Sequence, residues 1–241
     1  MAGKAENLAE MTGAEASPPA PPRIDRRRAP ETAAKILDAA ESLFSLRGFY
    51  GVSLRDIAGA AKVQVALTHY HFGSKEALFR AVVDRRADEH VRCLAEALDQ
   101  ALTVQGSRTE RRKAIIRAFI LPIVERTMRG GPGWKHYIRL MAQIANAPQQ
   151  EDYTVPFGQH FDDLVQSYIA ALKDLHPDME EGKVYWCFFF YQAMITHILA
   201  ESGMLDRQSG GRFHSSDLDA MVEQMVDFVS GGFLGLGAGP D

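Results

Sequence analysis

Residues 54–78 read LRDIAGAAKVQVALTHYHFGSKEAL, and the spacing of residue types in this stretch decides the fold. Ser53 stands directly before the stretch and Asp56 lies three residues later, a spacing that resembles a capping box and starts a short helix. A turn at Lys62-Val63 ends that helix. A second short helix is predicted from about Gln64 to Phe72, because a glycine follows it.

Longer helices are predicted on both sides of this pair. Ser74 caps a helix whose apolar residues recur at helical spacing as far as Leu102. On the other side, Pro30 suits the first turn of a helix whose single apolar face runs from Ile36 to Phe44. Two short helices between two longer ones are the arrangement of a helix-turn-helix module.

The charge of the chain is unevenly distributed. The 241 residues carry a net charge of -4. Residues 23–86, however, contain twelve Lys and Arg against seven Asp and Glu, a net charge of +5. A basic segment that coincides with a helix-turn-helix pattern favours a nucleic acid partner.

The chain divides into a tail and two helical parts. Residues 1–25 include a Pro-rich end and little apolar surface, so we expect a disordered N-terminal tail. Residues 26–80 hold the helix-turn-helix pattern. Residues 81–235 keep helical periodicity, and no segment alternates with period two long enough for a strand. The expected fold class is therefore all-α, with a three-helix N-terminal domain and a larger C-terminal helical domain.

The N-terminal part resembles the TetR family of transcriptional regulators over about residues 30–85. Several independent motifs carry this resemblance, and they are Ile36-Leu37-Asp38-Ala39-Ala40, Leu43-Phe44, Arg47-Gly48-Phe49, Asp56-Ile57-Ala58 and Tyr70-His71-Phe72-Gly73-Ser74-Lys75-Glu76-Ala77-Leu78. The resemblance implies a homodimeric repressor that binds a palindromic operator and releases it when a small apolar effector enters the C-terminal domain. Two recognition helices related by a twofold axis would occupy successive major grooves.

The resemblance also assigns the DNA-binding residues. Gln64, Val65 and Ala66 are expected to face the major groove, where base edges are read. His69, Tyr70 and His71 are expected to face the backbone or the bases. Lys75 is expected to contact a phosphate, as is Ser53 together with the N-terminus of its helix. The basic run Arg26-Arg27-Arg28 would follow the backbone or enter an adjacent groove.

The C-terminal part is expected to bind the effector and to dimerise. Residues 184–199 are apolar on nearly every side and need cover on every side. The resemblance implies that the last two helices pair with those of a second copy in a four-helix bundle, so one face of Tyr185 to Leu199 is assigned to the pocket and another to the dimer interface. Met225 lies on the apolar stripe of the last helix, where we expect a charge to split the dimer or to unfold the chain. The effector-binding residues are predicted on inward stripes of four helices, and they are Phe119, Trp134, Tyr137, Met141, Phe157, Phe161, Phe188 and Gln192.

The sequence leaves two classes of effector open. The Tyr70-His71-Phe72-Gly73-Ser74-Lys75 variant looks like that of regulators responding to fatty acids or acyl-CoA thioesters, and aromatic compounds are the alternative. The phosphates of a thioester would need cations, and Arg117, Lys135 and Arg139 lie near the predicted stripes.

Other functions have less support. A helix-turn-helix dimer without a ligand remains an alternative, as does an all-α enzyme with an apolar active site, although no catalytic motif is present. His69 and His71 point about 200° apart on a helix, which disfavours a metal site. Neither a metal nor a cofactor is expected. Two distant cysteines and no signal peptide or membrane span predict a reduced, cytoplasmic location.

Overall fold

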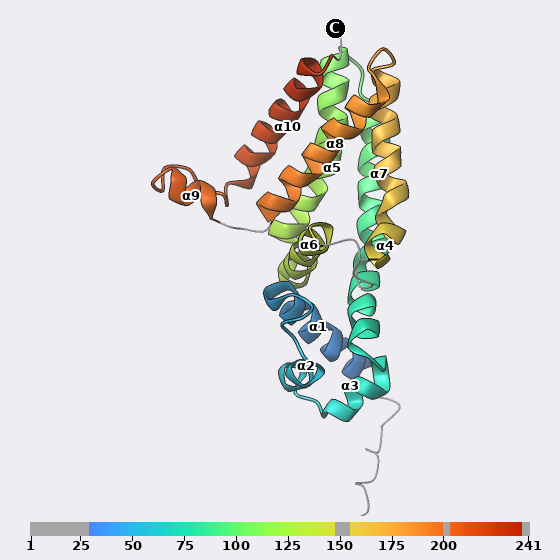
Figure 1. Ribbon diagram of the computed structural model, residues 1–241, viewed down its shortest axis with the longest axis vertical. Helices are drawn as coiled ribbons and strands as arrows, with labels where there is room; N and C mark the ends of the chain where they lie inside the picture. Colours follow the sequence, from blue (N-terminus) through green and yellow to red (C-terminus); the bar gives the residue numbers. More distant parts are fainter. Residues whose placement is uncertain (1–28, 148–154, 200–202, 238–241) are drawn as a thin grey trace, which may run out of the picture.

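The computed structural model describes residues 29–147, 155–199 and 203–237, apart from the side chains of residues 155–157 and 159. The described part is all-α and contains no strand, as predicted. The expected N-terminal tail and Arg26-Arg27-Arg28 lie outside the described residues. The helices, shown in Figure 1, are α1 (Ala29–Arg47), α2 (Leu54–Ala61), α3 (Val65–Phe72), α4 (Lys75–Leu102), α5 (Arg108–Arg129), α6 (Gly131–Ala145), α7 (Val155–Leu175), α8 (Glu181–Leu199), α9 (Met204–Gln208) and α10 (Leu218–Gly235).

Helices α1 to α3 and the start of α4 form the N-terminal domain around a small apolar core. Ile36, Ile57 and Leu78 are fully buried, and the rings of Phe44 and Phe79 meet edge to face with centroids 5.0 Å apart. The predicted capping box of α2 is present. The Phe44–Phe79 contact joins α1 to α4, so the domain depends on tertiary packing as well as on caps.

Helix α4 leaves the N-terminal domain and continues into the C-terminal domain without a break. The predicted boundary at residue 80 therefore falls inside a continuous helix. Along its length α4 packs against α5 and α7. Figure 1 shows this helix running from the helix-turn-helix up between the helices of the upper part of the molecule.

Helix α6 joins the two domains from the other side. It packs against α1 and α5, and Figure 1 shows it between these two helices. Gln143 of α6 donates a hydrogen bond to the carbonyl oxygen of Ser45 at 2.7 Å, and Nδ1 of His136 lies 3.0 Å from the Ser45 hydroxyl. The N-terminal domain is therefore held by α4 and α6 together.

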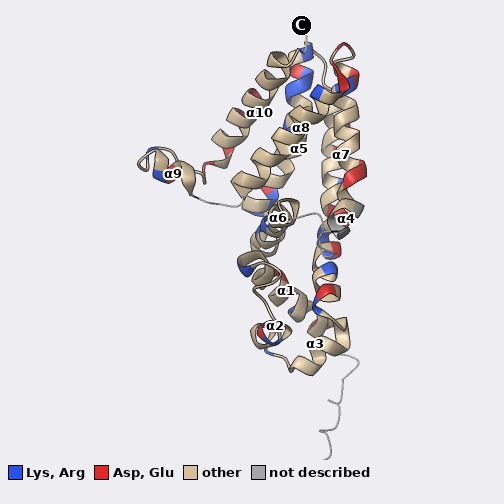
Figure 2. Cartoon of the chain, viewed as in Figure 1, with Lys and Arg blue, Asp and Glu red and all other residues tan. Residues whose placement is uncertain are grey.

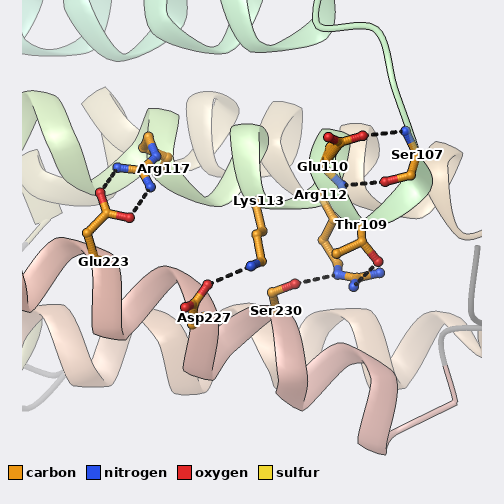
Figure 3. A network of polar contacts seen from close by, with 9 residues as sticks. All are labelled: Ser107, Thr109, Glu110, Arg112, Lys113, Arg117, Glu223, Asp227 and Ser230. Atoms are coloured by element: carbon orange, nitrogen blue, oxygen red, sulfur yellow. Dashed lines mark hydrogen bonds and ion pairs between the residues drawn. The ribbon is translucent and has the colours of Figure 1, made fainter.

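Polar contacts attach α10 to α5, as Figure 3 shows. Lys113 pairs with Asp227 at 2.7 Å, Arg112 donates from Nε to the Ser230 hydroxyl at 2.9 Å, and Arg117 makes a two-pronged contact with Glu223. The apolar stripe of α10 faces its own subunit, and Met225 is only 5% exposed. Met225 therefore belongs to the core of the subunit and not to an exposed dimer face, because α5 and α8 already cover this stripe.

Among the described residues, no helix combines the length and the apolar character needed to cross a membrane.

Candidate DNA-binding surface and effector region

Helix α2 ends in a turn at Lys62, whose backbone adopts the left-handed conformation. Lys62 has φ 57° and ψ 42°, and its N–H donates to the carbonyl of Gly59 while that of Val63 donates to Ala58. These bonds satisfy the last carbonyls of α2 and let the chain turn sharply into α3. Gln64 is the N-cap of α3, but its side chain makes no capping hydrogen bond.

Four of the residues predicted to contact DNA share an exposed surface at α3. Gln64, Ala66, His69 and Tyr70 are exposed, and Tyr70 is 62% exposed. Val65 is half-buried beside them. Figure 2 shows that α3 carries no Lys or Arg, so the helix offers only an amide, a methyl group, an imidazole and a phenol. Groups of this kind distinguish bases by hydrogen bonds and by contact with the thymine methyl group.

Two predicted DNA-binding residues are placed differently from the expectation. Lys75 donates from Nζ to the carbonyl oxygens of Phe49 at 3.1 Å and Val52 at 3.2 Å, and it lies 4.2 Å from the centroid of the Phe49 ring. His71 is half-buried, and its Nε2 atom is enclosed. The polar groups of both residues therefore turn largely toward the interior of the domain.

The sequence-based assignment omitted exposed basic and aromatic groups on the segment that precedes α3. Arg55 in the first turn of α2 and Lys62 in the turn are both exposed, and Tyr50 before α2 is 69% exposed. Ser53 is exposed at the N-cap of α2, where the helix dipole favours a phosphate. The place of Lys62 in the turn directly before α3 was the sequence signal by which this residue could have joined the candidate DNA-binding residues.

The residues predicted to bind the effector form two separate aromatic groups. Trp134, Tyr137 and Phe161 surround His90 of α4, with ring centroids 5.6 to 6.1 Å from that imidazole. Phe119 and Phe188 pack instead with Tyr168 and Tyr191. Met141 is buried and Gln192 is half-buried, whereas the side chain of Phe157 is outside the described part.

These aromatic groups do not line the open cleft of about 510 Å³ between α4, α5 and α7. That cleft is lined by apolar side chains that include Leu98 and Ile115, together with Asp99, Arg111 and Asp174. None of the seven predicted effector residues whose side chains the structure describes contributes to it. Five of the expected pocket residues pack instead within the two aromatic groups, against rings from neighbouring helices.

Burial changes the pKa of several groups in this region. Desolvation, with a smaller contribution from the charge of Arg126, lowers the pKa of His90 to about 3. Desolvation raises the pKa of the Tyr137, Tyr168 and Tyr191 hydroxyls, and it raises the pKa of the Cys187 thiol to about 11. At neutral pH the His90 imidazole is therefore uncharged.

Helix α8 divides into a buried face and an exposed aromatic face. Val184, Phe188 and Tyr191 are buried, whereas Trp186, Phe189 and Phe190 are 59%, 58% and 51% exposed. In Figure 2 nearly all of α8 is uncharged, and the neighbouring α10 adds Phe228, which is 72% exposed. The exposed rings of Trp186, Phe189 and Phe190 contact one another, and grouped exposed apolar side chains are typical of an interaction surface.

The described residues contain no group of three or more His, Cys, Asp or Glu side chains placed to hold a metal ion. Nδ1 of His69 lies 3.0 Å from the carbonyl oxygen of Gly73, at the end of its own helix. This local contact accounts for the orientation of the imidazole.

Comparison with known proteins identifies the family. Residues 36–82 match the family model described as bacterial regulatory proteins of the tetR family, and residues 117–232 match the Tetracyclin repressor-like C-terminal domain. The chain belongs to the TetR family. Members of the TetR family are regulatory proteins, so the enzyme alternative is set aside.

The curated relatives of this TetR-family chain are regulators. An HTH-type transcriptional repressor of Mycobacterium tuberculosis is 40% identical over an alignment of 94 residues, which covers 35% of this chain. This chain spans about half (50%) of the length of that relative. IcaR of Staphylococcus aureus, a negative transcriptional regulator of a biofilm operon, is 28% identical over 154 residues, covering 62% of this chain and 70% of IcaR.

Solved TetR-family structures share the fold. A regulator from Mesorhizobium loti superposes with a TM-score of 0.57 at 18% identity, covering 86% of this chain and 97% of its own. A TetR-like regulator from Rhodococcus sp. gives a TM-score of 0.55 at 20% identity, covering 88% of this chain and all (100%) of its own. At these identities the likeness concerns the fold alone.

Proposed function

We propose that this TetR-family protein is a transcriptional repressor that binds a palindromic operator as a homodimer. The observation that carries the proposal is the exposed surface of Gln64, Ala66, His69 and Tyr70 on α3, held by the turn at Lys62. A helix presented in this way fits the major groove, and the neighbouring Arg55 and Lys62 supply charges for phosphates. The printed names of the curated relatives, a repressor and a negative regulator, support the same activity.

The homodimer would form through the exposed faces of α8 and α10. Trp186, Phe189 and Phe228 are the most exposed large apolar side chains of these two helices. Burying them against a second copy removes apolar surface from water at about 25 cal/mol per Å². A twofold dimer also places two α3 helices for two half-sites.

Selection of bound DNA from a random pool tests the proposal. The selected site should be an inverted repeat whose half-site centres are about 34–36 Å apart or a multiple of one helical turn. A site without dyad symmetry, or no enrichment at low salt, would contradict repression by a dimer. Gln64→Ala protein, selected in parallel, should lose preference at one position of each half-site.

The effector proposed for the C-terminal domain is a small aromatic compound, with fatty acids and acyl-CoA thioesters as the other classes. The thioester loses support because Arg117, one of the three cations considered for its phosphates, is bound to Glu223, with Nη2 to Oε2 at 2.6 Å. Binding of the effector must favour a conformation in which the two α3 helices are wrongly spaced for the operator.

A dimer without a ligand remains the second candidate function. It is favoured by the contact between the Trp134 and Tyr137 rings and by the packing of these rings and of Phe161 on His90. A thermal-shift screen separates the two, because a ligand at 100 times its dissociation constant stabilises the protein by about 2.7 kcal/mol. Operator binding with no ligand response from any apolar class would favour the ligand-free dimer.

A further inference from the structure

Three buried tyrosines of the C-terminal domain differ in how their hydroxyls are bound. Tyr168 donates to the carbonyl of Leu94 at 2.6 Å and also lies 3.0 Å from that of Ala118, and Tyr191 donates to Ile116 at 2.7 Å. Tyr137 is 0% exposed, yet its hydroxyl has no hydrogen-bond partner among the described residues. An enclosed hydroxyl without a partner is costly, so Tyr137 needs a different explanation from the other two.

A second enclosed polar atom lies in the same aromatic group. His90 is 5% exposed, and its Nδ1 atom likewise has no hydrogen-bond partner within the described part of the chain. The ring centroids of His90 and Tyr137 are 5.9 Å apart, and both rings contact Trp134 at 5.6 to 6.1 Å. Phe161 of α7 closes the group at 5.6 Å from His90. Two unmatched polar atoms therefore share one aromatic enclosure.

The charged residues around this enclosure are already paired. Arg86 binds Glu41 of α1, with Nε to Oε2 at 2.9 Å, and Arg126 binds Glu89 at 3.2 Å. Both guanidinium groups also lie over the Trp134 ring, at 5.0 and 4.1 Å from its centroid. Because each cation has its own carboxylate, an anionic ligand would enter without a counter-ion, and burying an uncompensated charge is strongly unfavourable.

We propose that His90 Nδ1 and Tyr137 Oη bind a small, flat, uncharged aromatic molecule with one hydrogen-bonding group, such as a phenol or an aryl amide, beside Trp134 and Phe161. The rings are in contact in this structure, so the ligand has to separate them. A molecule of about one aromatic ring would require the smallest displacement. The inference rests on the proposed effector control and names the chemistry of the effector.

The same enclosure adjoins the contact between the two domains. Gly133 in the first turn of α6 lies against the Glu41–Arg86 pair, since a Cβ there would stand 2.3 Å from Arg86 Nη2 and 3.1 Å from Glu41 Oε1. A ligand that displaces the next residue, Trp134, would therefore press this part of α6 onto a pair that holds α1. Displacement of α1 changes the placement of α3, which packs against it.

Four matched probes test the ligand chemistry on the full chain. We would titrate p-cresol, p-toluamide, p-toluate and toluene by calorimetry and by thermal shift. p-Cresol and p-toluamide should bind at least about tenfold more tightly than toluene, which has no hydrogen-bonding group, and than p-toluate, which is charged. Equal binding of all four, or preferential binding of p-toluate, would overturn the proposal.

Tyrosine variants then locate the site. Tyr137→Phe removes only the hydroxyl, so it should weaken p-cresol about tenfold and raise the melting temperature of the ligand-free protein, because an unmatched polar group is lost. Tyr168→Phe and Tyr191→Phe are the matched controls, which should lower the melting temperature and leave the affinity for p-cresol within about twofold. A lower melting temperature of Tyr137→Phe would reveal a structural partner for the hydroxyl and refute the assignment, as would unchanged affinity.

Operator release is measured separately with p-cresol on the selected DNA. Binding of p-cresol that depends on Tyr137 but leaves the operator bound would support this ligand site and contradict effector control by it. If p-cresol releases the operator equally from wild type and from Tyr137→Phe, effector control is supported. The assignment of the ligand site to Tyr137 is then overturned.

Discussion

The ammonium of Lys75 lies 4.2 Å from the centroid of the Phe49 ring and donates a hydrogen bond to the Phe49 carbonyl oxygen at 3.1 Å. This contact links the first turn of α4 to the segment between α1 and α2. Lys75 therefore stabilises the DNA-binding domain. Its ammonium group donates to two carbonyl oxygens and makes a cation–π contact with an aromatic ring. The third donor of the ammonium stays compatible with a phosphate contact.

Lys75→Ala should therefore lower stability as well as DNA affinity. Loss of two hydrogen bonds and a cation–π contact is expected to cost about 1–3 kcal/mol of unfolding free energy. Urea denaturation and a salt titration of operator binding measure the two effects. Lys62→Ala is the control, since this exposed lysine should reduce the salt slope by about one per subunit without changing stability. An unchanged unfolding midpoint for Lys75→Ala would contradict the structural role.

Gln64→Ala should change specificity alone. The Gln64 side chain makes no capping hydrogen bond, so its removal should leave the melting temperature within about 1 °C. Loss of a base contact should cost about 1–3 kcal/mol at one position of each half-site. Competition binding with single-base operator variants measures this preference. A uniform loss of affinity for every sequence would place Gln64 on a phosphate instead.

Phe228→Glu and Met225→Glu should fail in different ways. Phe228 is 72% exposed on α10, so a carboxylate there should yield a folded monomer. Met225 is 5% exposed, and a buried unpaired charge should unfold the subunit. Sedimentation velocity and circular dichroism distinguish the two results. A Phe228→Glu protein that stays dimeric at micromolar concentration would exclude this face as the dimer interface.

His90 should make stability depend on pH in the mildly acidic range. Its pKa is lowered from 6.5 to about 3 in the folded state, so below pH 6.5 the unfolded chain binds a proton that the folded chain refuses. The resulting stability is complete above pH 6.5 and is lost as the pH falls toward about 3. Between pH 7.5 and 5.5 wild type should lose roughly 1.3 kcal/mol more than His90→Phe.

Chemical denaturation at both pH values measures this difference. His197→Gln serves as the control, because it removes one exposed histidine and leaves His90 in place. Parallel dependence of the unfolding free energy on pH in wild type and His90→Phe would mean that His90 titrates as it would in water. That result would contradict the burial of His90 in the aromatic group.

The helix-turn-helix could be predicted from the sequence because its signals are local. Ser53 and Asp56 form a cap within three residues, and the turn at Lys62-Val63 needs no distant partner. The all-α fold followed from helical periodicity in the same way. Periodicity also identified which residues share a face, including the apolar residues of α8 and α10.

Only the tertiary structure decided what covers each face. Met225 and Phe228 lie three residues apart on α10, yet one is in the core and the other is exposed, because α5 and α8 cover only one side of the helix. Tyr137 and Tyr168 look alike in sequence, but carbonyl groups of α4 and α5 meet only the hydroxyl of Tyr168. Periodicity fixes directions around one helix axis, whereas burial and hydrogen bonding depend on the position of other helices that are distant in the chain.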